Sequence, residues 1–180
     1  MNYGWARGAA ALAMIAVLAG PLAACDRTPA APDETAAQNL RAAEFFMTSN
    51  ARREGVQTLP SGVQYKVVHS GPPGGERPDR NDLVRVDYEG TLTDGTVFDS
   101  SFQAGQPAVF TVSDVVPGWT EVLQQMRVGD EWIVYLPPAL GYGEQGRPGI
   151  PPNAVMVFRL KLLDIARAPG GDRGGAIGQG

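Results

Sequence analysis

Residues 84–98 carry the pattern that decides the fold: Val-Arg-Val-Asp-Tyr-Glu-Gly-Thr-Leu-Thr-Asp-Gly-Thr-Val-Phe. Apolar and polar residues alternate from Val84 to Tyr88, which is typical of a strand with one buried face. The dipeptide Asp94-Gly95 favours a tight hairpin turn, and Val97-Phe98 then opens a returning strand. This stretch therefore predicts an antiparallel hairpin.

Similar short patterns occur on both sides of the hairpin. Further strands are expected around residues 65–67, 109–112, 132–136 and 155–165. A short helix that ends near Gly129 is expected after Pro117-Gly118, because Trp119, Leu123 and Met126 fall at i, i+4 and i+7. An antiparallel sheet with one helix covering its apolar face makes an α+β domain.

The first 34 residues have the pattern of an export signal followed by a tether. Residues 1–24 combine one positive charge with an apolar run that is too short to span a membrane. The run ends in Leu-Ala-Ala-Cys25, which resembles the lipobox of bacterial lipoproteins and predicts acylation of Cys25. The alternative is a chance cysteine after an ordinary signal peptide. Asp26 resembles an inner-membrane retention signal, and residues 25–34 form a polar tether.

A helical segment is expected over residues 35–56, outside the strand-rich part. Asp33 is a candidate cap for a helix over about 35–53, on which Ala36, Leu40, Ala43 and Met47 share one face. We expect this face to pack on the chain's own domain rather than to form a dimerisation rod. The Gly-rich residues 167–180 are expected to be disordered.

Composition excludes several classes of function. The chain has 15 Lys and Arg against 19 Asp and Glu, a formal charge of -4, and no dense basic run that would bind nucleic acid. Cys25 is the only cysteine, so an intramolecular disulfide is excluded. His69 is the only histidine and lies at the end of an expected strand. We therefore predict no metal site, no cofactor and no His-based catalytic centre.

From residue 57 to residue 165 the chain resembles the FKBP family of peptidyl-prolyl cis/trans isomerases. The resemblance lies in ordered motifs: Thr58-Leu-Pro-Ser-Gly-Val-Gln-Tyr65, Val86-Asp-Tyr-Glu-Gly-Thr-Leu92, Gly95-Thr-Val-Phe-Asp-Ser-Ser101, Val115-Val-Pro-Gly-Trp119, Met126-Arg-Val-Gly129, Leu140-Gly-Tyr-Gly143, Pro148-Gly-Ile-Pro-Pro152 and Val157-Phe158. The first and fourth motifs resemble the secreted bacterial branch related to macrophage infectivity potentiators.

This resemblance implies an FKBP-like α+β domain over residues 57–166. Its antiparallel sheet of five to six strands is expected to wrap around the one short helix, with the N-terminal helix outside. The resemblance also implies a pocket with Trp119 as its floor. The implied catalytic residues are Tyr88, Asp99 and Tyr142, and the implied substrate-binding residues are Phe98, Val115, Val116, Trp119, Ile150 and Phe158.

Within that pocket, Tyr142 and the backbone N–H of Ile150 are expected to bind substrate carbonyl groups, and Asp99 to orient Tyr88. Two positions depart from the family pattern. Ala108 stands where many relatives have a second aromatic residue, which predicts a thinner wall, and Arg147 stands where relatives often have His. The core is expected to include Phe110, Trp132, Leu123 and Met126.

The implied activity is isomerisation of X-Pro bonds in exported polypeptides while they fold. The expected protein is a monomer, anchored by lipid in the cell envelope and facing the periplasm, and it is expected to bind macrolides such as rapamycin and tacrolimus. Two alternatives remain: a proline-motif binding module or holdase chaperone with little turnover, and a purely structural envelope lipoprotein. Fold alone does not choose between them.

Overall fold

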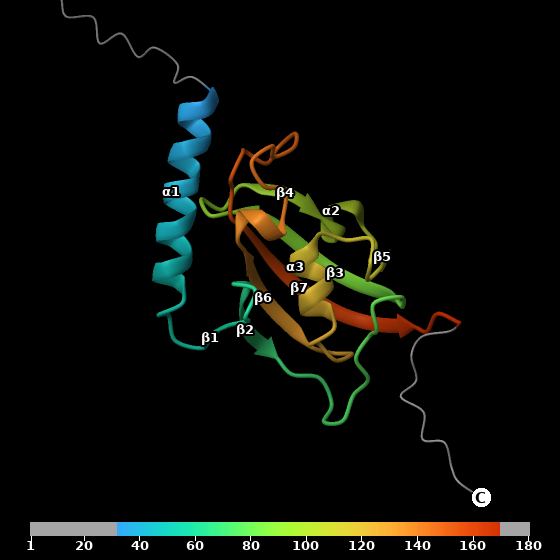
Figure 1. Ribbon diagram of the computed structural model, residues 1–180. Helices are drawn as coiled ribbons and strands as arrows, with labels where there is room; N and C mark the ends of the chain where they lie inside the picture. Colours follow the sequence, from blue (N-terminus) through green and yellow to red (C-terminus); the bar gives the residue numbers. More distant parts are fainter. Residues whose placement is uncertain (1–31, 170–180) are drawn as a thin grey trace, which may run out of the picture.

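The computed structural model describes residues 32–169, in which one antiparallel sheet curves around a short helix (Figure 1). The strands are β1 (Val56–Thr58), β2 (Gln64–His69), β3 (Leu83–Leu92), β4 (Val97–Ser100), β5 (Ala108–Thr111), β6 (Glu131–Leu136) and β7 (Met156–Ala166). The helices are α1 (Pro32–Asn50), α2 (Ser101–Ala104) and α3 (Pro117–Leu123), with a 3-10 turn, η1, at Pro138–Leu140. The strand order is β1-β2-β6-β7-β3-β4, and β5 also pairs with β3.

Strand β3 organises the sheet because it pairs with three other strands. β7 runs beside its whole length on one edge. On the other edge β5 pairs with its first half and β4 with its second half. The predicted alternation is confirmed by burial, since Val84 and Val86 have no exposed surface and Tyr88 is nearly buried.

The predicted hairpin is also confirmed. The Leu92 N–H donates to the Thr96 carbonyl at 2.9 Å, and the Gly95 N–H donates to the Leu92 carbonyl at 3.0 Å. Gly95 has a φ of 88°, a left-handed conformation that glycine adopts without steric cost. The Asp94 carboxylate accepts a hydrogen bond from the Thr96 N–H. This turn brings β4, and with it Phe98, back beside β3.

The α+β class is confirmed, with two differences in detail. The sheet has seven strands rather than five to six, because the three-residue β1 adds an edge strand that the sequence pattern did not predict. Helix α3 ends at Leu123 rather than near Gly129. Met126 nevertheless has no exposed surface, because the turn after the helix keeps its side chain in the core.

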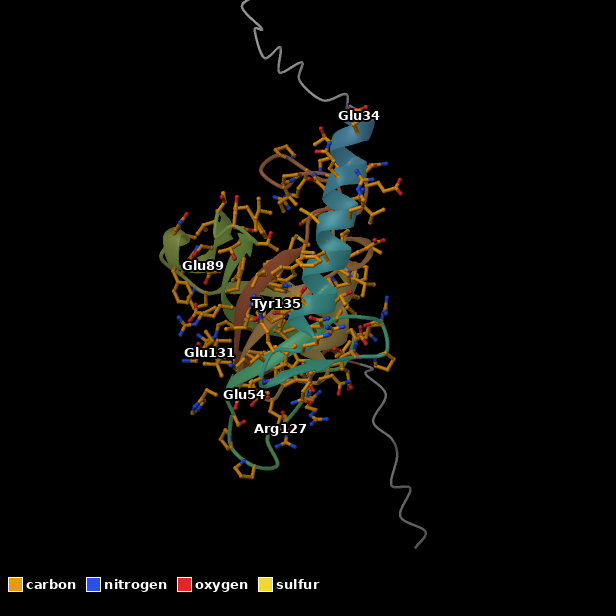
Figure 2. The ribbon with its side chains drawn as sticks, turned by 90° about the vertical axis from the view of Figure 1, so that its left-hand side faces the viewer. Glu34, Glu54, Glu89, Arg127, Glu131 and Tyr135 are labelled. Carbon is orange, nitrogen blue, oxygen red and sulfur yellow. The ribbon has the colours of Figure 1, made fainter. Side chains whose placement is uncertain are left out.

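Helix α1 lies across the other face of the sheet. Residues alternate faces along a strand, so β6 directs Val134 and Leu136 into the core and Tyr135 to the opposite side. The Phe46 ring of α1 lies 6.1 Å from the Tyr135 ring, centroid to centroid. Figure 2 shows α1 in front of the sheet, beside Tyr135.

The prediction for α1 was correct in packing and wrong in detail. The helix spans Pro32–Asn50 rather than 35–53, so Asp33 lies in its first turn and does not precede it as a cap. Leu40 is 40% exposed, whereas Asn50 is 1% exposed. The contact face therefore includes buried polar residues, which hydrophobic periodicity does not identify.

Several expectations lie outside the described residues: the signal peptide, Cys25, Asp26, the tether before residue 32, and the tail after residue 169. Between residues 32 and 169, no helix combines the length and the hydropathy needed to span a membrane.

A buried carboxylate fastens the end of β7 to the loop before β3. Asp82 is 1% exposed and accepts hydrogen bonds from the Asp79 N–H at 2.7 Å, the Ala168 N–H at 3.0 Å and the Arg167 guanidinium at 2.6 Å. Burial alone would raise the pKa of Asp82, but these three donors outweigh it and hold the pKa below the ordinary 3.8.

We expect Asp82→Asn to lower the free energy of unfolding by about 1–3 kcal/mol at neutral pH. A carboxyl whose pKa is lowered by folding stabilises the chain fully above its unfolded pKa, near 3.8. That contribution declines as the pH falls below this value and is lost at the folded pKa. Urea denaturation of both proteins should therefore show a difference that shrinks below about pH 4.

The control is Asp79→Asn, because the Asp79 side chain is 56% exposed and lies 3.7 Å from Arg167. Its effect should be below about 1 kcal/mol. A stability loss in Asp82→Asn that does not change with pH would contradict this interpretation.

Candidate active site

An aromatic cavity, here called the cup, lies where α3 meets β3, β4, β5, β7 and the loop after η1. Its volume is about 440 Å³, within the range typical of ligand sites. The lining residues are Tyr88, Phe98, Asp99, Phe110, Asp114, Val115, Val116, Trp119, Tyr142, Arg147 and Phe158. Six of these are aromatic, so the interior of the cup is mainly apolar.

Trp119 forms the floor of the cup and is 4% exposed. Three rings surround it nearly at right angles, with centroid distances of 5.1 Å to Phe158, 5.2 Å to Tyr88 and 5.8 Å to Phe110. Edge-to-face contacts of this kind stabilise aromatic clusters beyond simple burial. They also hold the Trp119 ring in one orientation.

Two aromatic walls of the cup meet at a glycine of β3. Phe98 of β4 and Phe158 of β7 lie on opposite sides of β3, and their ring centroids are 5.6 Å apart. Gly90 lies between them, opposite Phe158 in the β3–β7 register. A Cβ at Gly90 would come within 2.7 Å of atoms in both rings. The absence of a side chain there lets the two rings close the wall.

Two polar groups lie at one side of the cup. Tyr88 is 8% exposed. Burial, followed by the interaction with the Asp99 carboxylate, raises the pKa of Tyr88 above the ordinary 10.0. Tyr88 therefore keeps its proton at physiological pH. Asp99 is exposed on β4. The pair therefore consists of a solvent-exposed carboxylate and a buried hydroxyl group.

Tyr142 and Arg147 lie over the cup on the loop after η1. The Arg147 guanidinium donates to the Tyr142 hydroxyl oxygen at 2.6 Å, and its carbon lies 4.9 Å from the ring centroid. Because the hydroxyl oxygen accepts this bond, the hydroxyl proton remains free to be donated. A neighbouring positive charge also strengthens the hydroxyl as a donor.

Of the nine residues predicted for the site, all except Ile150 line the cup. Ile150 is 4% exposed and belongs to the core. Its backbone N–H donates to the Arg147 carbonyl at 2.8 Å. The loop's own bridge occupies this N–H in the structure, and its binding to a substrate carbonyl stays a prediction.

The sequence prediction missed Phe110, Asp114 and the contact of Arg147 with the cup. Phe110 was expected in the core, but it is half-buried and contacts both Tyr88 and Trp119. It shares a strand face with Ala108, two residues earlier, where the wall was expected to be thin. The spacing of two along β5 was a signal for this role, since alternate strand residues share one face.

Within residues 32–169, no group of three or more His, Cys, Asp or Glu side chains is arranged to hold a metal ion. His69 is exposed at the end of β2. It does not line the cup.

Comparison with known proteins agrees with this geometry. A family profile described as FKBP-type peptidyl-prolyl cis-trans isomerase matches residues 74–163. A second, described as the domain amino terminal to FKBP-type peptidyl-prolyl isomerase, matches residues 17–67. The second match includes β1 and most of β2, which here belong to the same sheet as the rest.

Individual relatives give the same result. The chain is 47% identical over 140 residues to the FKBP-type peptidyl-prolyl cis-trans isomerase FkpA of Aeromonas hydrophila, covering 78% of this chain and 52% of that protein. It is 43% identical to the outer membrane protein MIP of Legionella longbeachae, and the match covers 76% of this chain and 58% of that protein. The crystal structure of FkpA from Escherichia coli superposes with a TM-score of 0.73 at 41% identity. The superposition covers 77% of this chain and 64% of that chain.

The sheet, the aromatic cup and these matches together define the class of protein as an FKBP fold. The chain belongs to the family of FKBP-type peptidyl-prolyl cis-trans isomerases. It spans little more than half the length of the two curated relatives described above.

We expect Gly90→Ala to open the wall of the cup. The added methyl group cannot fit between the Phe98 and Phe158 rings without moving one of them, a change that costs about 1–3 kcal/mol. Urea denaturation should show this loss. Thr91→Ala, at the next position of β3, is the control and should cost less. Equal stability of Gly90→Ala and the wild type would show that the rings do not depend on this gap.

Proposed function

We propose that this chain catalyses cis/trans isomerisation of X-Pro bonds. The observation that supports the proposal best is the cup itself, in which Trp119 is enclosed by perpendicular aromatic rings and lies under a loop carrying a free phenolic donor. No bond is broken in the reaction, so the catalyst needs neither a nucleophile nor a cofactor.

The physical basis is a difference in polarity between the flat and the twisted amide. Rotation about the X-Pro bond crosses a barrier of about 20 kcal/mol, because it interrupts amide resonance. The planar amide is polar through that resonance, whereas the twisted amide has lost much of its charge separation. A dry aromatic cup therefore destabilises the planar state more than the twisted one. Only such differential binding raises the chemical rate.

In this proposal the residues have separate roles. The Trp119 ring supports the pyrrolidine, while Phe98, Phe110 and Phe158 exclude water. Tyr142 donates a hydrogen bond to a substrate carbonyl, strengthened by Arg147. Asp99 orients Tyr88 and shapes the local field without transferring a proton.

The proposed substrates are exported polypeptides that contain X-Pro bonds. Macrolides such as rapamycin and tacrolimus are proposed as competitors for the same cup.

We expect the purified protein to accelerate isomerisation of a proline-containing peptide in a protease-free assay, and rapamycin to abolish that activity. Trp119→Leu and Asp99→Ala should each lower kcat/KM by at least about tenfold, equivalent to 1.4 kcal/mol. Tyr142→Phe should cause a smaller loss, because one neutral hydrogen bond contributes only about 1 kcal/mol.

Tyr135→Phe is the matched control for Tyr142→Phe, because Tyr135 lies on the opposite face of the sheet, under α1. Its kcat/KM should equal that of the wild type. Unchanged rates in both Trp119→Leu and Asp99→Ala would remove the proposed site. Peptide binding without turnover would favour the binding-module or holdase alternative, which Ala108 and the altered loop at Arg147 motivate. Phe110 weakens the first of these grounds, because it lines the wall on the same strand as Ala108.

We propose a location in the cell envelope, with the chain held to a membrane by acylated Cys25. The proposal is supported by the Leu-Ala-Ala-Cys25 motif and by the Legionella relative, which is named an outer membrane protein. Several acyl chains on one residue hold a protein firmly, since each buried methylene contributes about 0.8 kcal/mol. Asp26 favours the inner membrane.

Mass spectrometry of the protein from bacterial membranes should identify an N-terminus at Cys25 that carries acyl chains. Cys25→Ser should lose both the acyl mass and the membrane association, because no other cysteine can replace it. An intact Met1, or an unmodified Cys25 at the N-terminus, would contradict the lipid anchor.

A further inference from the structure

The cup depends on a loop that has little regular structure. The cup loop, residues 141–154, carries Tyr142 and Arg147 over the cavity. Its tip is held by the paired backbone bonds between Arg147 and Ile150, at 2.8 Å and 2.9 Å. A Cβ on Gly149 would lie 3.9 Å from the Cβ of Phe98. The tip of the loop therefore lies beside β4, at the edge of the cup.

The two ends of the cup loop are joined at Asn153. Its backbone N–H donates to the Gly143 carbonyl at 2.8 Å, next to Tyr142. Asn153 is 5% exposed, and its φ of 54° makes it the one non-glycine residue with a positive φ among the described residues. A left-handed conformation at a buried asparagine indicates that its surroundings constrain it.

Helix α1 forms hydrogen bonds to this end of the loop. The Asn153 side-chain amide donates to the Ala36 carbonyl at 3.0 Å, and the Asn39 side-chain amide donates to the Pro152 carbonyl at 2.8 Å. These two bonds run in opposite directions between neighbouring turns of α1 and neighbouring residues of the loop. Figure 1 shows α1 beside the base of this loop, drawn in orange.

The other end of α1 is fixed to the sheet. Asn50 donates to the Gln64 side-chain oxygen at 2.9 Å, and Gln64 donates to the Met47 carbonyl at 2.8 Å. Asn50 and Gln64 are 1% and 4% exposed. Helix α1 therefore connects β2 to the cup loop through side-chain hydrogen bonds at both of its ends.

Between these ends the contact is narrow. Two cavities, of about 350 Å³ and 210 Å³, flank α1, and Ala43 and Asn153 line both. The hydrogen bonds of Asn39 and Asn153 lie beside this narrow contact and join α1 to the loop.

We propose that α1 is a positioning element of the isomerase site, and that Asn39 and Asn153 keep the cup loop in the place where Tyr142 reaches the substrate. This inference rests on the proposed function. It extends the site to a helix that lines no part of the cup, and it makes substrate affinity depend on that helix.

The first test is hydrogen exchange of the full chain, read by mass spectrometry over residues 141–154. Asn39→Ala alters only α1, yet exchange in the cup loop should become several-fold faster. Asn153→Gly should do the same, because glycine keeps the left-handed backbone but loses the bond to Ala36. Gln38→Ala, at the exposed neighbouring position, should leave exchange unchanged. Unchanged exchange in Asn39→Ala would overturn the inference.

The second test separates positioning from general loss of stability. Asn39→Ala should raise KM about three- to tenfold and leave kcat within about twofold, as expected when a hydrogen bond made in both the ground and the transition state is lost. In a Tyr142→Phe background, Asn39→Ala should have no further effect, because its action runs through that hydroxyl. Equal losses in both backgrounds would overturn the inference.

The two tests also distinguish the inference from the function on which it rests. A wild-type chain without turnover would remove the proposed function, while the exchange measurement would still decide whether α1 holds the loop. Turnover that is sensitive to Trp119→Leu but indifferent to Asn39→Ala would keep the function and reject the role of α1.

Discussion

The structure depends on keeping water away from one indole ring. Trp119 projects from the short helix α3 into a space where three aromatic rings meet it edge-on. Those rings come from β3, β5 and β7, so the enclosure exists only when the sheet is fully assembled. Burial of this cluster and formation of the site are therefore the same event, and the residues that stabilise the fold also define the chemistry.

Strand β3 makes that enclosure possible because it pairs with three strands at once. It contributes Tyr88 directly and, at Gly90, the gap in which Phe98 and Phe158 meet. A larger residue at Gly90 would be compatible with a strand but not with a closed wall. The alternating residues of β3 thus form one buried face of the sheet, and the lack of a side chain at Gly90 shapes the cavity.

Much of this was predictable from the sequence, for identifiable reasons. The hairpin at Asp94-Gly95 and the burial of Val84 and Val86 follow from local pattern, and most of the cup follows from the ordered family motifs. The failures are tertiary. Strand periodicity does not tell whether Phe110 faces the core or a cavity within it, and a motif does not tell that the Ile150 side chain belongs to the core rather than to the lining of the cup. Helix α1 contacts the cup loop through Asn39 and β2 through Asn50, and a search for apolar stripes does not identify such polar contacts.

That last failure has a physical explanation in the composition of the cup loop. Pro148, Pro151 and Pro152 have no backbone N–H, so this segment cannot be held by a strand ladder. Its carbonyls and its remaining N–H groups must find partners elsewhere, because unpaired buried polar groups are costly. Asparagine side chains supply donors at the required positions without demanding a regular backbone. A loop that has to stand over a cavity, away from the sheet, is therefore supported by a helix that reaches it with polar side chains.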